Sequence, residues 1–492
     1  MKKYILFLLA VLTFLCSGCS NKNYVGSNWD ALEKRTSQDG LSLPSDTPEQ
    51  ISRNIEYAIQ MTKYLVFVPN YFDALYGIGS AYNTAIDNWV ELNYSQAAAE
   101  LMEIEQYLVQ RNDLYYPDDL AIVQNSLACI NMELADYRIA YDHLIDAYVT
   151  MYKLYGDVQD TPEELRFYYR APALTLCRYY YIIGDYESCL SEIDRLREDI
   201  GSHNDENEAI EYLRLFILCT LNNIEGDVCD DRGRVGDAIS LYMDSVRLCN
   251  NYRETHEDDM FVNILELELS YRMAEAFSQL QYTDVEYAKN AEILYNKALN
   301  ILDAYAGDTA FGSGMKSYVL ATKAHFLTDF SNRRQEALEC LREALEMMGA
   351  TYKQGKHILH YYETACTCAE IFGFVLGDYE EAIGQYNAIL EDSLNHNGYN
   401  HPDTLLIYES MGRFFSNRMS DDEKGIECFS HALEICRNLL IENSKTCAQI
   451  YLQLAGCYKI AGEQEKSDDC LNKAYSLFEN LGIHVLQADE VE

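Results

Sequence analysis

The chain has 492 residues, 24% of them charged, and a formal net charge of −41 at pH 7. Such a surface repels nucleic-acid phosphates and anionic headgroups, so the composition argues against a protein that binds DNA, RNA or membrane surfaces through its side chains. The length exceeds that of one compact core, which leaves several domains or an extended repeat.

The first 18 residues have the pattern of a secretory signal. Two lysines precede an apolar run from Tyr4 to Leu15, which is too short to span a bilayer comfortably. The following Ser17-Gly18-Cys19 resembles the lipobox of bacterial lipoproteins, in which the cysteine is acylated and becomes the new N-terminus. The resemblance implies that residues 1–18 are removed and that Cys19 carries lipid. The alternative is an ordinary signal peptide with incidental cysteines.

The residues after Cys19 bear on where the protein resides. Ser20 stands where an Asp would signal retention in the inner membrane, and Asn21-Lys22-Asn23 lacks the acidic stretch of some surface-exported lipoproteins. By resemblance to Gram-negative lipoproteins, we expect a cell-envelope protein anchored in the outer membrane and facing the periplasm. Residues 19–47 are expected to form a flexible tether. Without the two signal lysines the mature chain would carry a charge of −43.

Four of the seven prolines mark predicted helix starts, and each is followed by polar or acidic residues and then an apolar one. Proline at the first helical position loses no needed N–H, and acids suit the positive end of the helix dipole. The segments are Pro48-Glu49-Gln50-Ile51, Pro117-Asp118-Asp119-Leu120, Pro162-Glu163-Glu164-Leu165 and Pro402-Asp403-Thr404-Leu405.

A repeated pattern organises the body of the chain. Gly184-Asp185-Tyr186 and Gly377-Asp378-Tyr379 each place a turn before an aromatic residue, and a small residue follows three positions later. A second small residue commonly lies seven positions further along the same helical face. The first small residues of the successive repeats are Ala97, Ala140, Cys189, Ala238, Ala291, Ala337, Ala382, Gly425 and Ser467. Their spacing settles near 42 residues towards the C-terminus.

An amphipathic helix with its own small residue precedes each turn. The last pair of helices carries Leu454, Ala455, Tyr458, Gly462, Ser467, Leu471 and Ala474. This pattern resembles the tetratricopeptide repeat, and Asn400-His401-Pro402-Asp403-Thr404 with the longer period resembles its kinesin-light-chain type. The resemblance implies an all-α fold, a right-handed α-solenoid of about nine hairpins over residues 48–482, with an acidic tail at 483–492.

The cysteines and acidic clusters give no clear site. Fourteen of the sixteen cysteines lie beyond Cys19 without any C-x-x-C spacing, at positions where a small buried residue would serve. The group His357, His360, Cys366 and Cys368 could suggest a metal site, but its two cysteines point in different directions on one helix. The segment from Gly226 to Gly236, with three aspartates, is expected to be a solvated loop because calcium-loop spacing is absent.

Neither a catalytic motif nor a cofactor motif is present, so we expect no enzyme activity, no cofactor and no metal. In tetratricopeptide domains the first helix of each hairpin lines the concave groove. The resemblance therefore implies a set of groove-facing candidates for partner binding, each of which could instead be a solvated surface residue. They are Asn125, Arg178, Tyr181, Glu409, Arg413 and Lys459. The repeated Lys/Asn set that clamps a peptide carboxylate in some family members is missing.

The favoured function is a non-catalytic, lipid-anchored scaffold that binds a protein or peptide partner from the envelope. One alternative is a glycan- or nutrient-binding outer-membrane lipoprotein of the SusD type, although those proteins present Trp-rich platforms and only Trp29 and Trp89 occur here. Another is a relative of sensor-regulators that join such repeats to a membrane helix and a DNA-binding domain, neither of which the sequence displays.

Overall fold

The computed structural model describes residues 79–90, 93–110, 117–155, 163–201, 208–255, 260–282, 284–305, 310–330, 332–352 and 360–483. The predicted signal, the tether and Cys19 lie outside these residues, as does the acidic tail beyond Ile483. The described residues contain helices and turns and no strand, which confirms the all-α prediction.

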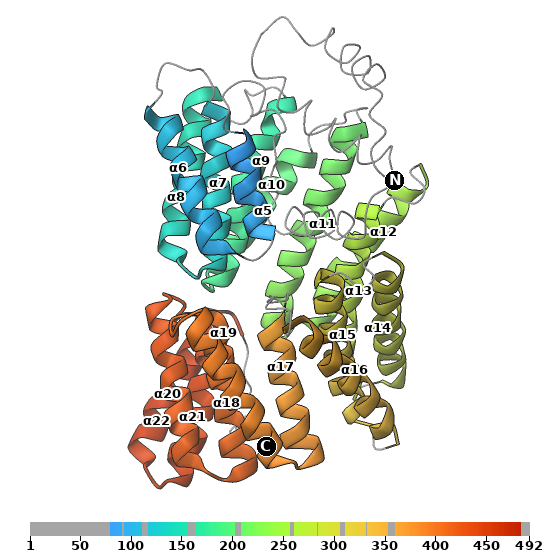
Figure 1. Ribbon diagram of the computed structural model, residues 1–492, viewed down its shortest axis with the longest axis vertical. Helices are drawn as coiled ribbons and strands as arrows, with labels where there is room; N and C mark the ends of the chain where they lie inside the picture. The colour runs from blue at the N-terminus through green and yellow to red at the C-terminus, as the bar shows by residue number, and fades with distance from the viewer. Residues whose placement is uncertain are drawn as a thin grey trace, which may run out of the picture. The chain divides into compact units, whose positions relative to one another are not determined.

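The described helices follow one another along the chain, from blue to red in Figure 1. They are α5 (Gly79–Val90), α6 (Tyr94–Gln110), α7 (Pro117–Glu133), α8 (Tyr137–Tyr155), α9 (Glu163–Ile182), α10 (Tyr186–Gly201), α11 (Glu208–Asp231), α12 (Val235–Arg253), α13 (Met260–Gln279), α14 (Val285–Tyr305), α15 (Ala310–Thr328), α16 (Arg334–Tyr352), α17 (Tyr361–Glu370), α18 (Tyr379–His396), α19 (Pro402–Phe414), α20 (Asp422–Asn438), α21 (Lys445–Ile460) and α22 (Gln464–Asn480). Short π-helical turns, η2 (Ile371–Leu376) and η3 (Phe415–Met419), extend α17 and α19. Pairs such as α7 with α8, α15 with α16 and α21 with α22 pack as hairpins, in agreement with a tetratricopeptide-type solenoid.

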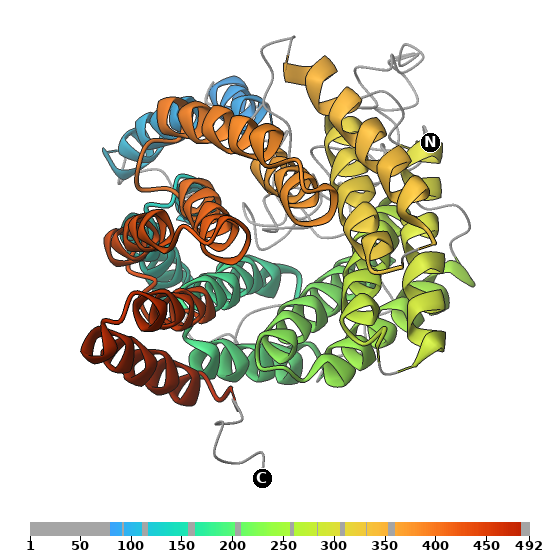
Figure 2. The ribbon, with the colours of Figure 1, turned by 90° about the horizontal axis from the view of Figure 1, so that it is seen from below.

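The helices form two compact units. Among the described residues, unit 1 comprises those up to Tyr179, Leu190–Leu221 and Asn251–Phe261, and unit 2 comprises Tyr180–Cys189, Asn222–Asn250 and those from Val262 onwards. Helices α9 to α13 therefore contribute residues to both units. Within unit 2 the helices from α13 to α22 succeed one another in chain order (Figure 2).

The small residues that defined the repeat lie in the cores of the hairpins. All nine first small residues are buried, and so are their partners seven positions later, including Ala298, Ala432 and Ala474. Buried small residues let helix backbones approach closely and leave room for neighbouring rings. At Gly412 an added Cβ would lie 2.6 Å from the ring of Phe429, so α19 and α20 can pack as they do only because this residue has no side chain. The predicted register of the repeat is confirmed.

Two predicted helix starts are present as expected within the described residues. Helix α7 begins at Pro117, and α19 begins with Pro402 at its first turn, where the ring of His401 accepts a hydrogen bond from the Asp403 N–H at 3.2 Å. Asp378 caps α18 by accepting from the Glu381 N–H at 3.2 Å. Pro48 and Pro162 lie outside the described residues.

The expectation of a long loop from Gly226 to Gly236 is wrong. Helix α11 continues to Asp231, a short turn with Gly233 at φ 73° follows, and α12 begins at Val235. The misleading residue is Gly226, which lies inside α11 with the ring of Tyr242 directly against it. This glycine permits close packing of two helices and does not end a helix. The aspartates that follow it therefore lie on a helix and not in a loop.

The cysteines behave as core residues. All fourteen cysteines of the described helices are buried, and they are free thiols in the structure. Burial raises the pKa of several thiols, among them that of Cys368 to about 12. None of the described helices combines the length and apolar character needed to cross a membrane.

Candidate functional site

Two of the predicted partner-binding residues lie in unit 1. Asn125, on α7, is only 4% exposed, and its Oδ1 atom has no hydrogen-bond partner among the described residues. Arg178, near the end of α9, is partly exposed. Little of the Asn125 side chain is therefore accessible, whereas Arg178 remains open to contact.

The other candidates lie in unit 2, and the structure brings two of them together. Arg413 Nη2 donates to Glu370 Oε1 at 2.6 Å, and Arg413 Nε lies 3.7 Å from Glu409 Oε1. Ser410 Oγ also donates to Glu370 Oε1, at 2.8 Å. We call Glu370, Glu409, Ser410 and Arg413 the Arg413 cluster. It joins α17 to α19, the first helices of two successive hairpins.

The remaining candidates of unit 2 lie apart from this cluster. The ring of Tyr181 stacks on that of Tyr186 with centroids 6.0 Å apart. Burial, with the nearby charges of Asp227 and Asp231, raises the pKa of Tyr181 well above its usual value. Lys459 is exposed on α21.

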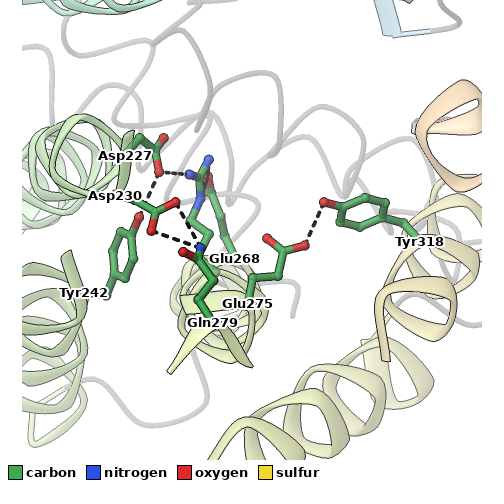
Figure 3. A network of polar contacts seen from close by, with 8 residues as sticks. Asp227, Asp230, Tyr242, Glu268, Glu275, Gln279 and Tyr318 are labelled. Carbon is green, nitrogen blue, oxygen red and sulfur yellow. Dashed lines mark hydrogen bonds and ion pairs between the residues drawn. The ribbon is translucent and has the colours of Figure 1, made fainter. Parts of the chain in front are cut away.

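A larger polar network, which sequence reasoning missed, spans α11, α12, α13 and α15 (Figure 3). Arg272 on α13 donates to Asp227 on α11 and, at 3.1 Å, to Glu268 one turn earlier on its own helix. The Tyr242 hydroxyl donates to Asp227 at 2.9 Å. Further along α13, the Gln279 side chain donates to Asp230 at 3.1 Å. These residues, with Glu275 and Tyr318, are called the α13 network.

Glu275 has the most unusual environment in this network. The hydroxyl of Tyr318 on α15 donates to Glu275 Oε1 at 2.9 Å. Burial raises the pKa of Glu275 to about 7, although the Tyr318 hydrogen bond and the charges of Arg272 and His360 oppose the rise. The His360 ring stacks on Tyr318 with centroids 4.5 Å apart. A carboxyl group that titrates near neutrality is thus held between two first helices.

The α13 network is partly open to solvent and has an excess of acids. The side chains of Asp227, Glu268 and Arg272 are 15–21% exposed. Arg272 is the one cation in a network that holds four carboxyl groups. Asn223, one turn before Asp227, is 2% exposed, and its Oδ1 atom has no hydrogen-bond partner in the described part of the chain.

One signal in the sequence could have located Glu275. It directly follows Ala274, as Arg413 follows Gly412 and Arg178 follows Cys177, so it occupies the same position next to a small residue of a first helix. Asp227 was hidden by the interpretation of Gly226 as a turn.

The suggested metal ligands are not brought together. His357 lies outside the described residues, His360 contacts Glu363, and Cys366 and Cys368 are buried in α17. Within the ranges that the structure describes, no group of three or more His, Cys, Asp or Glu side chains is arranged to hold a metal ion.

Comparisons with known proteins found one matching family and several solved structures of low similarity. The tetratricopeptide repeat family matches residues 414–480, and no curated protein matches the sequence. Among solved structures, BtubC (BKLC) from P. vanneervenii has 21% identity over 51% of this chain and 94% of its own, with a TM-score of 0.38. A Rap protein complexed with Competence and Sporulation Factor has 14% identity over 74% and 93%, with a TM-score of 0.41. The apo form of the quorum sensor NprR from B. thuringiensis has 15% identity over 71% and 98%, with a TM-score of 0.35. The described part of the chain is helical, and its residues 414–480 match the tetratricopeptide repeat family.

Proposed function

We propose that this protein is a non-catalytic scaffold whose first-helix surface in unit 2 binds a protein or an extended peptide. The observation that carries the proposal is the α13 network. The first helices α11, α13 and α15 present partly exposed carboxyl, guanidinium and tyrosine groups. Tyrosine and arginine are enriched in protein interfaces.

The charge of this surface favours a basic partner. The α13 network holds four carboxyl groups and one guanidinium, and this excess of acids has the same sign as the net charge of −41 for the whole chain. The partly exposed carboxylates are acceptors, which lysine, arginine or backbone N–H groups of a partner could satisfy. Attraction between exposed charges is screened over about 8–10 Å at physiological salt, so added salt should weaken binding, mainly through a slower association rate.

We further propose that the protein is tethered to the outer membrane through Cys19 and faces the periplasm. Cys19 lies outside the described residues, and the support is the signal pattern with its lipobox-like Ser17-Gly18-Cys19. Several acyl chains anchor stably where one alone gives marginal binding, at about 0.8 kcal/mol per buried CH₂. An envelope protein is then the expected partner.

The experiment is a pull-down with the full-length chain from envelope extract, followed by affinity measurements on variants with the identified partner. Glu268→Gln removes a charge from the α13 network, and we expect it to weaken binding by about tenfold if a basic group docks there. Glu339→Gln is the matched control because it makes the same change at an exposed site on α16, a second helix. Arg178→Glu and Arg413→Glu test two of the other candidates in the same assay.

One pattern of affinities among these variants would contradict the proposal. If Glu268→Gln and Arg413→Glu both bind the partner within about twofold of the wild type while Glu339→Gln weakens it, the partner binds the second-helix face. The assignment to the first-helix surface would then be wrong.

A further inference from the structure

Two turns far apart in the sequence meet in unit 2. At Gly184, between α9 and α10, an added Cβ would lie 2.5 Å from the carbonyl oxygen of Asn443 and 3.2 Å from the Cα of Ser444. Asn443 and Ser444 belong to the turn between α20 and α21. The backbones of the two turns therefore touch, and the absence of a side chain at Gly184 permits it.

Arg232, in the turn after α11, extends this contact to the last helix. Its Nε atom donates to the carbonyl oxygen of Leu481 at 2.8 Å, and Nη2 donates to Glu187 at 2.6 Å. Its guanidinium also lies over the ring of Tyr186, 5.6 Å from the centroid. Leu481 is the C-terminal cap of α22, where carbonyl groups lack intrahelical partners and a cation is favoured.

A second ion pair lies beside Arg232. Lys445 Nζ, at the start of α21, is 3.1 Å from Asp231 Oδ1, and the Tyr186 hydroxyl donates to Asp231 Oδ2 at 2.6 Å. The side chains of Arg232, Asp231 and Lys445 are 13%, 22% and 29% exposed, so solvent screens these pairs less than it screens a surface pair. Glu187 is 82% exposed and adds little.

These contacts differ in kind from those that hold the two helices of a hairpin together. The helices of a hairpin pack through buried small and apolar residues, as at Gly412 on α19 and Phe429 on α20. The contacts described here are ion pairs, hydrogen bonds and one backbone approach. Polar contacts of this type are individually weak and depend on salt, so they can break while the hairpins stay folded.

We propose that Gly184, Asp231 and Arg232 form a clasp with Asn443, Lys445 and Leu481, which holds these distant turns of unit 2 together and opens reversibly. The last turn of α11 carries Asp231 in the clasp and Asp227 and Asp230 in the α13 network. Opening the clasp therefore alters the surface assigned to partner binding, a consequence that rests on the proposed function. The clasp itself can be tested without any partner.

The test is zero-length carbodiimide crosslinking of the purified full-length chain, read by mass spectrometry. Carbodiimide joins an amine to a carboxylate only where the two are in contact. We expect an intramolecular crosslink between Lys445 and Asp231, and the internal standard is the crosslink between Lys297 and Glu266, which are 2.5 Å apart. Mixing isotopically labelled with unlabelled chains distinguishes a crosslink within one chain from one between chains.

Two variants with matched controls weaken the clasp in different ways. Arg232→Ala should lower the Lys445–Asp231 yield by about fivefold relative to the standard, whereas Arg234→Ala, which removes an exposed arginine that pairs with Asp237, should not. Gly184→Ala should lower it as well. Gly462→Ala, at the same φ of 79° but with nothing within 4 Å of the added Cβ, should leave it unchanged. About 1 M salt, where the Debye length is about 3 Å, should lower the yield in the wild type.

Three outcomes would overturn the clasp. The first is a wild-type chain that forms the Lys297–Glu266 crosslink but not the Lys445–Asp231 one, and the second is a Lys445–Asp231 crosslink found only between chains. The third is equal yield in Arg232→Ala and Arg234→Ala. If Gly184→Ala fails to fold, as circular dichroism would reveal, the arginine pair still decides.

Discussion

Arg413 Nη2 donates to Glu370 Oε1 at 2.6 Å, and the two residues are 43 positions apart, one repeat period. Glu370 also accepts from Ser410 at 2.8 Å, while Glu409 Oε1 lies 3.7 Å from Arg413 Nε. One arginine thus bridges two carboxylates on successive first helices. Burial raises the pKa of Glu409, and Arg413 opposes the rise.

Removing either partner of this pair should cost stability, and a double-mutant cycle isolates the interaction. Because the Arg413 side chain is 37% exposed, we expect a coupling energy between Glu370→Ala and Arg413→Ala of only about 1 kcal/mol. Urea unfolding of the wild type, both single variants and the double variant measures it. Additive effects of the two substitutions would mean that the ion pair contributes nothing to the joint between α17 and α19.

Because of the titration of Glu275, the free energy of unfolding should fall as the pH rises from about 4.5 to about 7. Its pKa is raised to about 7 in the folded state, so over this range the unfolded chain releases a proton that the folded protein keeps. Glu275→Gln keeps an acceptor for Tyr318 and removes the titration. The variant should gain about 1–3 kcal/mol relative to the wild type between pH 4.5 and pH 8. Arg272, His360 and Glu363 also face Glu275, so the wild-type–variant difference is the quantity to follow.

Denaturant unfolding at several pH values measures this difference. Glu339→Gln, the same substitution at an exposed site on α16, should follow the wild-type curve. A Glu275→Gln curve that runs parallel to the wild type across the range would show that Glu275 is ionised in the folded protein at pH 5 as it is in the unfolded chain.

The buried cysteines should resist modification. All fourteen in the described helices are buried, and burial raises the pKa of thiols such as Cys457, to about 11, so few are thiolates at neutral pH. Alkylation of the native protein should therefore leave most of them unmodified, and alkylation after denaturation should label them as free thiols. Differential labelling with mass spectrometry gives the count. Several native disulfides would place the protein in an oxidised compartment with covalent links between helices.

Cys19→Ala should abolish lipidation and release the protein from the membrane fraction. The expectation follows from the Ser17-Gly18-Cys19 pattern. Fractionation and metabolic labelling with a fatty acid measure it. Cys16→Ala is the control, since this neighbouring cysteine lies within the predicted signal. A Cys19→Ala chain that still requires detergent for release would contradict the lipobox interpretation.

The sequence predicted the architecture well because the fold depends on local, repeated features. A small residue every 42 to 53 positions, with helix starts such as Pro402, recurs throughout the chain, and the structure buries those small residues as expected. The same counting placed Glu409 and Arg413 together on α19. It would also have located Glu275 if Ala274 had been taken as the small residue of its helix.

Other features depend on contacts that one repeat cannot reveal. Glycine is typical of turns, and this suggested a turn at Gly226. Only the structure shows why a glycine lies inside α11, because the Tyr242 ring packs against it. The bond from Arg232 to Leu481 joins residues 249 positions apart, and its existence depends on the accumulated geometry of every hairpin between them. Local periodicity carries no information about such closure.

Ala432→Glu tests the register of the C-terminal repeats, where the family match lies. Ala432 is fully buried on α20, and a carboxylate there would have no partner. Burying an unpaired charge should cost about 3–5 kcal/mol and melt the last hairpins locally. Ser430→Glu is the matched control because Ser430 is exposed on the same helix, so the same side chain would lie in solvent. Circular dichroism and limited proteolysis should show early melting and cleavage near α20–α22 for Ala432→Glu alone. If both variants melt together with the wild type, residue 432 accepts a charge and the packing register of α20 is not the one described.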